Sequence, residues 1–236
     1  MPRVLLVSNS TVHGGGYLDH VAGELADFLG AGARRVAFVP YALRDRAGYA
    51  AKLRERLALL GLEVDAVDGG AERARAAVAG ADAVFVGGGN TFRLLKALHE
   101  EGLVAAIRAR VAAGMPYVGS SAGSNVACPT IRTTNDMPIV EPPTSAALGL
   151  VPFQLNPHYQ DPDPSSKHMG ETREQRIAEF HEEHATPVLG LREGAWVRVE
   201  GSEAVLGGRN GARLFRRGRE PEELATGARL DELLRG

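Results

Sequence analysis

The sequence contains a single cysteine, few aromatic residues and no long apolar run. Cys128 has no partner for an internal disulfide, which is typical of proteins from reducing compartments. No stretch approaches the roughly 18 consecutive apolar residues of a membrane-spanning helix. The apolar run near the N-terminus is also too short for a secretory signal. We therefore expect a cytoplasmic protein that has no membrane partner.

Neither sign of charge dominates the chain. The 27 Lys and Arg residues nearly balance the 29 Asp and Glu residues, and the net charge is −2. Without an excess of basic residues, nucleic acid is not an expected partner. A content of 44% hydrophobic and 24% charged residues is typical of a globular protein. Neither repeats nor linker-like tracts divide the chain, so we expect one domain over 1–236. A homodimer is one option for its assembly.

Short apolar runs alternate with helical patterns through the first half of the chain. Strands are predicted at 4–7, 36–39, 62–67, 83–86 and 116–119. Helices are predicted at 18–29, 49–60, 73–79 and 94–113, the last with a break at Gly102. This alternation favours an α/β fold, with a mostly parallel central sheet and helices on both faces. Shorter antiparallel strands are predicted at 187–191, 195–199, 203–206 and 213–215.

Ligands of such sheets bind beyond the carboxyl ends of the strands. The loops after Val7, Val86 and Val118 should therefore share one rim. Residues 128–148 are rich in Pro and Thr, and a loop of this length is usually either functional or disordered.

One of these loops carries a G-x-S-x-G pattern at 119–123, between a predicted strand and a short helix. In this context the pattern is typical of a nucleophile elbow, in which glycines relieve clashes around a strained serine. Ser121 has glycine at both −2 and +2, whereas Ser120 does not, so Ser121 is the candidate nucleophile. An ordinary Gly/Ser turn or a phosphate-binding turn is the alternative interpretation.

A serine nucleophile needs a base that is oriented by a third group. The downstream histidines are His158, His168, His181 and His184. We favour His158 because it follows an apolar run that should end at the same rim. His168 lies in a polar loop, and His181 and His184 lie on a charged helical segment where we expect solvent exposure.

Asp136 and Glu193 are both candidates for the third group, although either could be a turn cap or a surface charge. Ser121, Asp136 and His158 follow the hydrolase order Ser, acid, His, but order alone does not decide. We lean slightly to Asp136, because the following Met137-Pro138 restricts its backbone whereas Glu193 has a longer side chain with more rotamers to freeze. Glu193 lies at a predicted strand end, which is also a suitable place for such an acid.

The glycine run 87–89 follows another strand and precedes a helix. Free backbone N–H groups at such a turn can stabilise a developing oxyanion, and Ala122 with Gly88 or Gly89 could supply them. Phosphate binding is the rival, but the chain has neither a dinucleotide fingerprint nor a Walker lysine after these glycines.

Together these segments resemble the peptidase E family of serine peptidases, the α-aspartyl dipeptidases. The similarity covers most of the chain and is carried by residues 6–10, 86–92, 121–123, 128–140, 156–158 and 170–177. It implies a fold similar to the class I glutamine amidotransferases, no metal or cofactor, and hydrolysis of dipeptides with an N-terminal aspartate. It also implies that Ser121 is the nucleophile and His158 the base, with either Asp136 or Glu193 as the third member. The chain departs from the family at Ser120, where a bulky residue is common, and over 160–169.

A guanidinium can bind the aspartate side chain of such a substrate bidentately. Arg173 is the first candidate, followed by Arg132, and Asn90 is a polar candidate on the glycine loop. A helix-end salt bridge is the alternative role for Arg173. Two other functions stay open: a cyanophycinase-like peptidase that cleaves β-aspartyl bonds, and a non-catalytic module that binds a small molecule.

Overall fold

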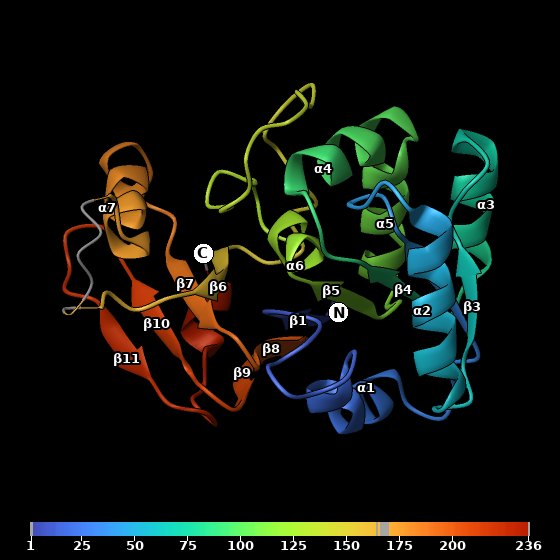
Figure 1. Ribbon diagram of the computed structural model, residues 1–236, viewed down its shortest axis with the longest axis horizontal. Helices are drawn as coiled ribbons and strands as arrows, with labels where there is room; N and C mark the ends of the chain where they lie inside the picture. Colours follow the sequence, from blue (N-terminus) through green and yellow to red (C-terminus); the bar gives the residue numbers. More distant parts are fainter. Residues whose placement is uncertain (1, 164, 166–169, 236) are drawn as a thin grey trace.

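The computed structural model describes residues 2–163, 165 and 170–235 and is built around a seven-stranded sheet (Figure 1). The strand order is β3-β2-β4-β5-β1-β8-β9. The strands are β1 (Arg3–Val7), β2 (Arg35–Val39), β3 (Glu63–Ala66), β4 (Ala83–Val86), β5 (Tyr117–Ser120), β8 (Ala195–Glu200) and β9 (Glu203–Gly208). The first five strands in this order are parallel, while β8 and β9 add antiparallel pairs beside β1. The predicted mostly parallel α/β sheet is therefore confirmed.

Helices cover both faces of this sheet, as predicted. They are α1 (Ala22–Leu29), α2 (Arg46–Ala58), α3 (Ala71–Gly80), α4 (Thr91–Glu100), α5 (Leu103–Ala112) and α6 (Ala122–Val126), with the short 3-10 helix η1 (Asp19–Val21) before α1. Successive side chains of a strand point to opposite faces. Leu5 and Phe38 thus pack against α1 and α2, whereas Leu6 and Val84 belong to the core under α3, α4 and α5. Gly102 separates α4 from α5 in a left-handed conformation, at the predicted break.

A second sheet of order β11-β10-β7-β6 lies beside the central one (left in Figure 1). It consists of β6 (Gln154–Tyr159), β7 (Val188–Arg192), β10 (Ala212–Phe215) and β11 (Glu222–Leu224). Helix α7 (Arg173–Glu183) packs on it through Ile177, which contacts the cluster of Tyr159, Val188 and Phe215. A final 3-10 helix, η2, spans Asp231–Arg235. The sequence predicted most of these strands but neither β11 nor their division between two sheets.

The carboxyl ends of the central strands meet at one edge. Val7 is paired with Ser120, and Val86 is paired with Gly119. The loops after β1, β4 and β5 therefore share the predicted rim. Among the described residues, no helix is both long and apolar enough to cross a bilayer.

Candidate active site

Ser121 lies at a strained turn between β5 and α6. Its φ is +53°, and its N–H donates to the carbonyl of Val7 at 2.9 Å. A Cβ on Gly119 would lie 2.6 Å from the carbonyl oxygen of Gly123, and a Cβ on Gly123 would overlap the carbonyl of Val86. Only glycine therefore fits on either side of this turn, which agrees with the steric logic of the G-x-S-x-G pattern.

The side chains of Ser121, His158 and Glu193 form a continuous hydrogen-bonded relay. Ser121 Oγ lies 2.9 Å from His158 Nε2, and His158 Nδ1 lies 2.7 Å from Glu193 Oε1. The histidine side chain is 40% exposed and the glutamate 53%, so the relay opens to solvent. Both distances are within the reach required of a nucleophile, a base and an orienting acid.

Two polar residues directly after β1, Ser8 and Asn9, bind the backbone at His158 and next to Glu193. The His158 N–H donates to Ser8 Oγ at 2.9 Å, and that hydroxyl donates to the Leu191 carbonyl at 2.8 Å. The Gly194 N–H, next to Glu193, donates to Asn9 Oδ1 at 2.8 Å. His158 has a φ of +54° at a bulge in β6, a conformation that needs such support. Sequence reasoning assigned neither Ser8 nor Asn9 a role, although polar residues directly after a buried strand were an available signal.

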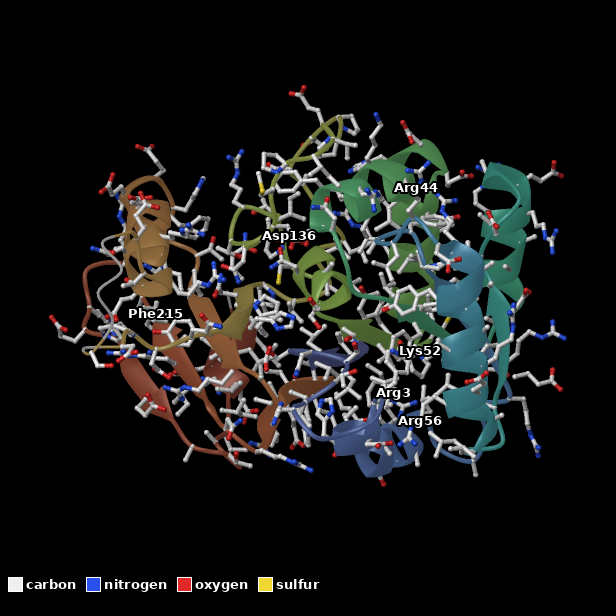
Figure 2. The ribbon with its side chains drawn as sticks, in the orientation of Figure 1. Arg3, Arg44, Lys52, Arg56, Asp136 and Phe215 are labelled. Carbon is white, nitrogen blue, oxygen red and sulfur yellow. The ribbon has the colours of Figure 1, made fainter. Side chains whose placement is uncertain are left out.

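The carboxylate of Asp136 binds the N-terminus of α4 and forms no hydrogen bond with His158 among the described residues. Its Oδ2 accepts from the backbone N–H of Thr91 at 2.7 Å and from the Thr91 hydroxyl at 2.6 Å. A carboxylate at this place suits the positive end of the α4 dipole. Figure 2 shows Asp136 on the loop beside α4 and α6. The slight preference for Asp136 as the partner of His158 thus disagrees with the geometry, because the loop 128–148 crosses the N-terminus of α4 and carries Asp136 there.

The backbone amides expected at the oxyanion hole differ in their availability. Ala122 is the first residue of α6, so its N–H has no acceptor within the helix. The Gly88 N–H, by contrast, donates to the Tyr49 hydroxyl at 2.8 Å. Gly89 has a φ of +131°, and a Cβ there would lie 2.7 Å from the Ala42 carbonyl oxygen. Its conformation therefore requires glycine.

The three candidate substrate-binding residues fall into different surroundings. Arg173 begins α7, where burial and the neighbouring Arg176 lower the pKa of its guanidinium while the carboxylate of Asp136 opposes this shift. Arg132 is exposed. The Asn90 side chain accepts from the Arg93 N–H at 3.0 Å and donates to the Met137 carbonyl at 2.9 Å. Asn90 therefore caps α4 and ties down the loop, and its amide is already occupied.

Two hollows flank Ser121 and His158. The larger has a volume of about 540 Å³, and its lining includes Gly88, Gly89, Tyr49 and Lys52. The smaller, of about 20 Å³, is lined in part by Ala122, Asn125 and Asp136. The nucleophile and its base thus face both hollows. The larger has room for a substrate residue, whereas the smaller holds about one water molecule and admits a residue only if its lining moves.

Two other candidate groups are buried away from solvent. Burial raises the pKa of the Cys128 thiol to about 12, so this cysteine is no rival nucleophile. The expectation that His181 is solvated is wrong: its side chain is buried, and Nε2 lies 3.1 Å from the Thr186 carbonyl oxygen. His168 lies outside the described residues.

Comparison with known proteins agrees with the fold and with the sequence resemblance. Residues 4–207 match the family described as Peptidase family S51. The chain is 61% identical to "Peptidase E" of Streptomyces coelicolor, covering 98% of this chain and 95% of that protein. It is 51% identical to "Probable alpha-aspartyl dipeptidase" of Drosophila melanogaster, covering 98% and 97% respectively. The crystal structure of a peptidase from an acI-B1 actinobacterium superposes with a TM-score of 0.73 at 17% identity, covering 98% of this chain and 96% of that one, which supports the fold. These matches identify the chain as a peptidase: it belongs to peptidase family S51.

Proposed function

We propose that the protein is a serine-type dipeptidase that hydrolyses peptides with an N-terminal aspartate. The observation that carries this proposal is the relay from Ser121 through His158 to Glu193, with separations of 2.9 and 2.7 Å. The names of the two curated relatives support the peptide class. No metal or cofactor enters the proposed reaction.

In the proposed reaction Ser121 Oγ attacks the scissile carbonyl while His158 Nε2 takes its proton. Glu193 accepts a hydrogen bond from Nδ1–H, which keeps the neutral imidazole in the useful tautomer and stabilises the imidazolium that forms. His158 then returns the proton to the leaving amine, and a water molecule completes hydrolysis of the acyl-enzyme. Glu193, rather than Asp136, is thus our choice for the third member of the triad.

The Ala122 N–H at the start of α6 is the first proposed donor to the oxyanion. Gly88 and Gly89 compete for the second place. Because the Gly88 N–H already donates to Tyr49, a substrate oxygen would have to displace the Tyr49 hydroxyl to reach it. Gly89 needs no such displacement, so we favour it.

An N-terminal aspartate carries an ammonium group and a carboxylate close together. Asp136 lines the smaller hollow, and its carboxylate acts electrostatically on the guanidinium of Arg173, so the two residues provide a complementary pair of charges. We propose that the guanidinium of Arg173 binds the side-chain carboxylate of the substrate. The Asp136 carboxylate would attract the substrate's ammonium group and offset the positive charge of Arg173.

A panel of dipeptides incubated with the purified protein tests the proposal. We expect Asp-Leu to be cleaved well and Asn-Leu and Glu-Leu poorly, by a factor on the order of 10² to 10⁵, since a site built for a charged partner rejects substrates that leave it unpaired. Faster cleavage of β-Asp-Leu than of Asp-Leu would instead indicate the cyanophycinase-like activity. A protein that cleaves none of these and does not react with a fluorophosphonate probe would be a binding module.

We also propose a cytoplasmic location, based on the single buried cysteine. Cell fractionation tests this proposal.

A further inference from the structure

The larger hollow contains a cation that the proposed chemistry does not use. Lys52 lines this hollow together with Ser121 and His158. Its Nζ lies 4.6 Å from the centre of the Tyr17 ring, a cation–π distance that directs the ammonium group across the ring. Figure 2 shows Lys52 on the side of α2 that faces the middle of the molecule.

The ammonium group of Lys52 is available to a ligand. Lys52 takes part in none of the ion pairs between described residues, whereas Lys96 pairs with Glu100 at 3.8 Å. Asp45 also lines the hollow, but its carboxylate accepts from the Gly48 N–H at 2.9 Å at the start of α2. The helix dipole partly offsets the charge of Asp45 there. Among the charged residues that line this hollow, Lys52 therefore has an ammonium group without an ion-pair partner among the described residues.

Helix α2 connects Lys52 to the reacting centre. Tyr49 lies three residues before Lys52, so the two side chains are neighbours on one helix face. The Tyr49 hydroxyl accepts from the Gly88 N–H, and a Cβ on Gly88 would lie 3.0 Å from Ser121 Cβ. Lys52 is thus one helical turn from Tyr49, whose hydroxyl binds the loop that touches the candidate nucleophile.

The chemistry of a dipeptide explains what this cation could bind. The carboxylate of its second residue is three bonds from the scissile carbonyl carbon, which places the two carbon atoms within about 4 Å of each other. If the aspartyl residue lies toward Arg173 and Asp136, the leaving residue occupies the larger hollow. We infer that Lys52 binds the free carboxylate of the leaving residue and thereby selects dipeptides over longer or amidated peptides. This inference rests on the proposed function.

Asp-Leu and its C-terminal amide, Asp-Leu-NH₂, test this inference because they differ only in the group that Lys52 would bind. For the wild-type protein we expect kcat/KM to be about 10- to 100-fold higher for Asp-Leu, as for a hydrogen bond to a charged group. Lys52→Met should remove most of that advantage by lowering kcat/KM for Asp-Leu while that for the amide stays close to wild type. Lys52→Arg should restore part of it, and Lys96→Met, on α4, is the matched control that should change neither substrate.

Equal losses on both substrates, or no loss on Asp-Leu, would overturn the assignment. A collapse of the preference for Asp-Leu over Asn-Leu in Lys52→Met would show that Lys52 acts on the aspartyl residue instead, and would equally overturn the assignment. If the wild-type protein cleaves no aspartyl peptide, this result contradicts the proposed function but does not by itself decide the role of Lys52. Calorimetric binding of Asp-Leu and Asp-Leu-NH₂ to Ser121→Ala, with and without Lys52→Met, then still decides the role of Lys52: a preference for the free acid that requires Lys52 supports it, and no such preference refutes it.

Discussion

At the scale of single residues, two adjacent serines at the end of β5 differ in their burial and in their hydrogen-bond partners. Ser120 is fully buried, and its Oγ has no hydrogen-bond partner among the described residues, whereas Ser121 Oγ contacts His158. We expect Ser121→Ala to lower kcat by roughly 10⁴-fold or more, as for loss of a triad nucleophile. Ser120→Ala should leave steady-state kinetics close to wild type. A dead Ser120→Ala enzyme beside an active Ser121→Ala enzyme would contradict this assignment.

The two candidate acids bind different partners, so their substitutions should have different effects on kinetics and stability. Glu193→Gln should lower kcat by up to about 10⁴-fold with little change in KM, because an amide favours the wrong tautomer of His158. Asp136→Asn should mainly raise KM and weaken folding by about 1 kcal/mol, since Asp136 caps α4 through Thr91. Kinetics and thermal unfolding of both variants separate these roles. A normal kcat for Glu193→Gln with a dead Asp136→Asn enzyme would transfer the role to Asp136.

At the scale of elements, the packing of α6 on β4 depends on a glycine. Because a Cβ on Gly123 would overlap the carbonyl of Val86, Gly123→Ala must push α6 and Ser121 away from the sheet. We expect it to destabilise the fold by about 1 to 3 kcal/mol and to abolish activity. Gly23→Ala in α1 is the matched control: a Cβ there meets no atom within 4 Å, and alanine should stabilise the helix by roughly 0.5 to 1 kcal/mol. Urea unfolding that ranks the two variants the other way would refute this account of the turn.

The last turn of α7 contains a buried histidine, His181, that contacts the carbonyl of Thr186. Burial lowers the pKa of His181 from its ordinary value of 6.5, and the hydrogen bond with the Thr186 carbonyl only partly opposes this. The unfolded chain then binds more protons than the folded one below about pH 6.5, so stability is lost as the pH falls through that value. We expect His181→Gln, which can still donate to Thr186, to reduce the loss of Tm between pH 7.5 and pH 5.5. An unchanged pH dependence would show that His181 does not contribute.

At the scale of the whole molecule, the candidate site forms where the two sheets meet. Ser121 directly follows β5 of the central sheet, and His158 lies in β6 of the second sheet. Ser8, directly after β1, binds both β6 and β7. Ser8→Ala would leave the His158 N–H and the Leu191 carbonyl without this partner, at a cost of about 1 to 3 kcal/mol.

We therefore expect Ser8→Ala to lower kcat at least about tenfold while KM changes less, because a small misplacement of a catalytic group is costly. Ser202→Ala, at an exposed turn between β8 and β9, should change neither kcat nor Tm. Measured kcat and thermal unfolding check both variants. An unaltered kcat in Ser8→Ala would show that the rest of the fold orients His158 by itself.

Features that depend on neighbours in the chain were predictable from the sequence. The apolar runs and helical periods predicted the parallel strands and their helices, and the glycines at 119 and 123 singled out Ser121. The common rim followed as well, because parallel strands must present their carboxyl ends at one edge.

Only the tertiary structure decided which distant groups meet. Nothing in the local sequence of Glu193 or Asp136 shows that one contacts His158 and the other Thr91, since both contacts depend on how β6, β7 and the loop 128–148 pack against the central sheet. The division of the C-terminal strands between two sheets could not be predicted for the same reason. Strands 195–199 and 213–215 have similar apolar patterns but pair with different strands. The sequence by itself therefore determined the sheet and the serine turn, through periodicity and steric exclusion within short segments. Long-range packing, which no short segment encodes, decided the partners of His158, the support from Ser8 and Asn9, and the position of Lys52 in the larger hollow.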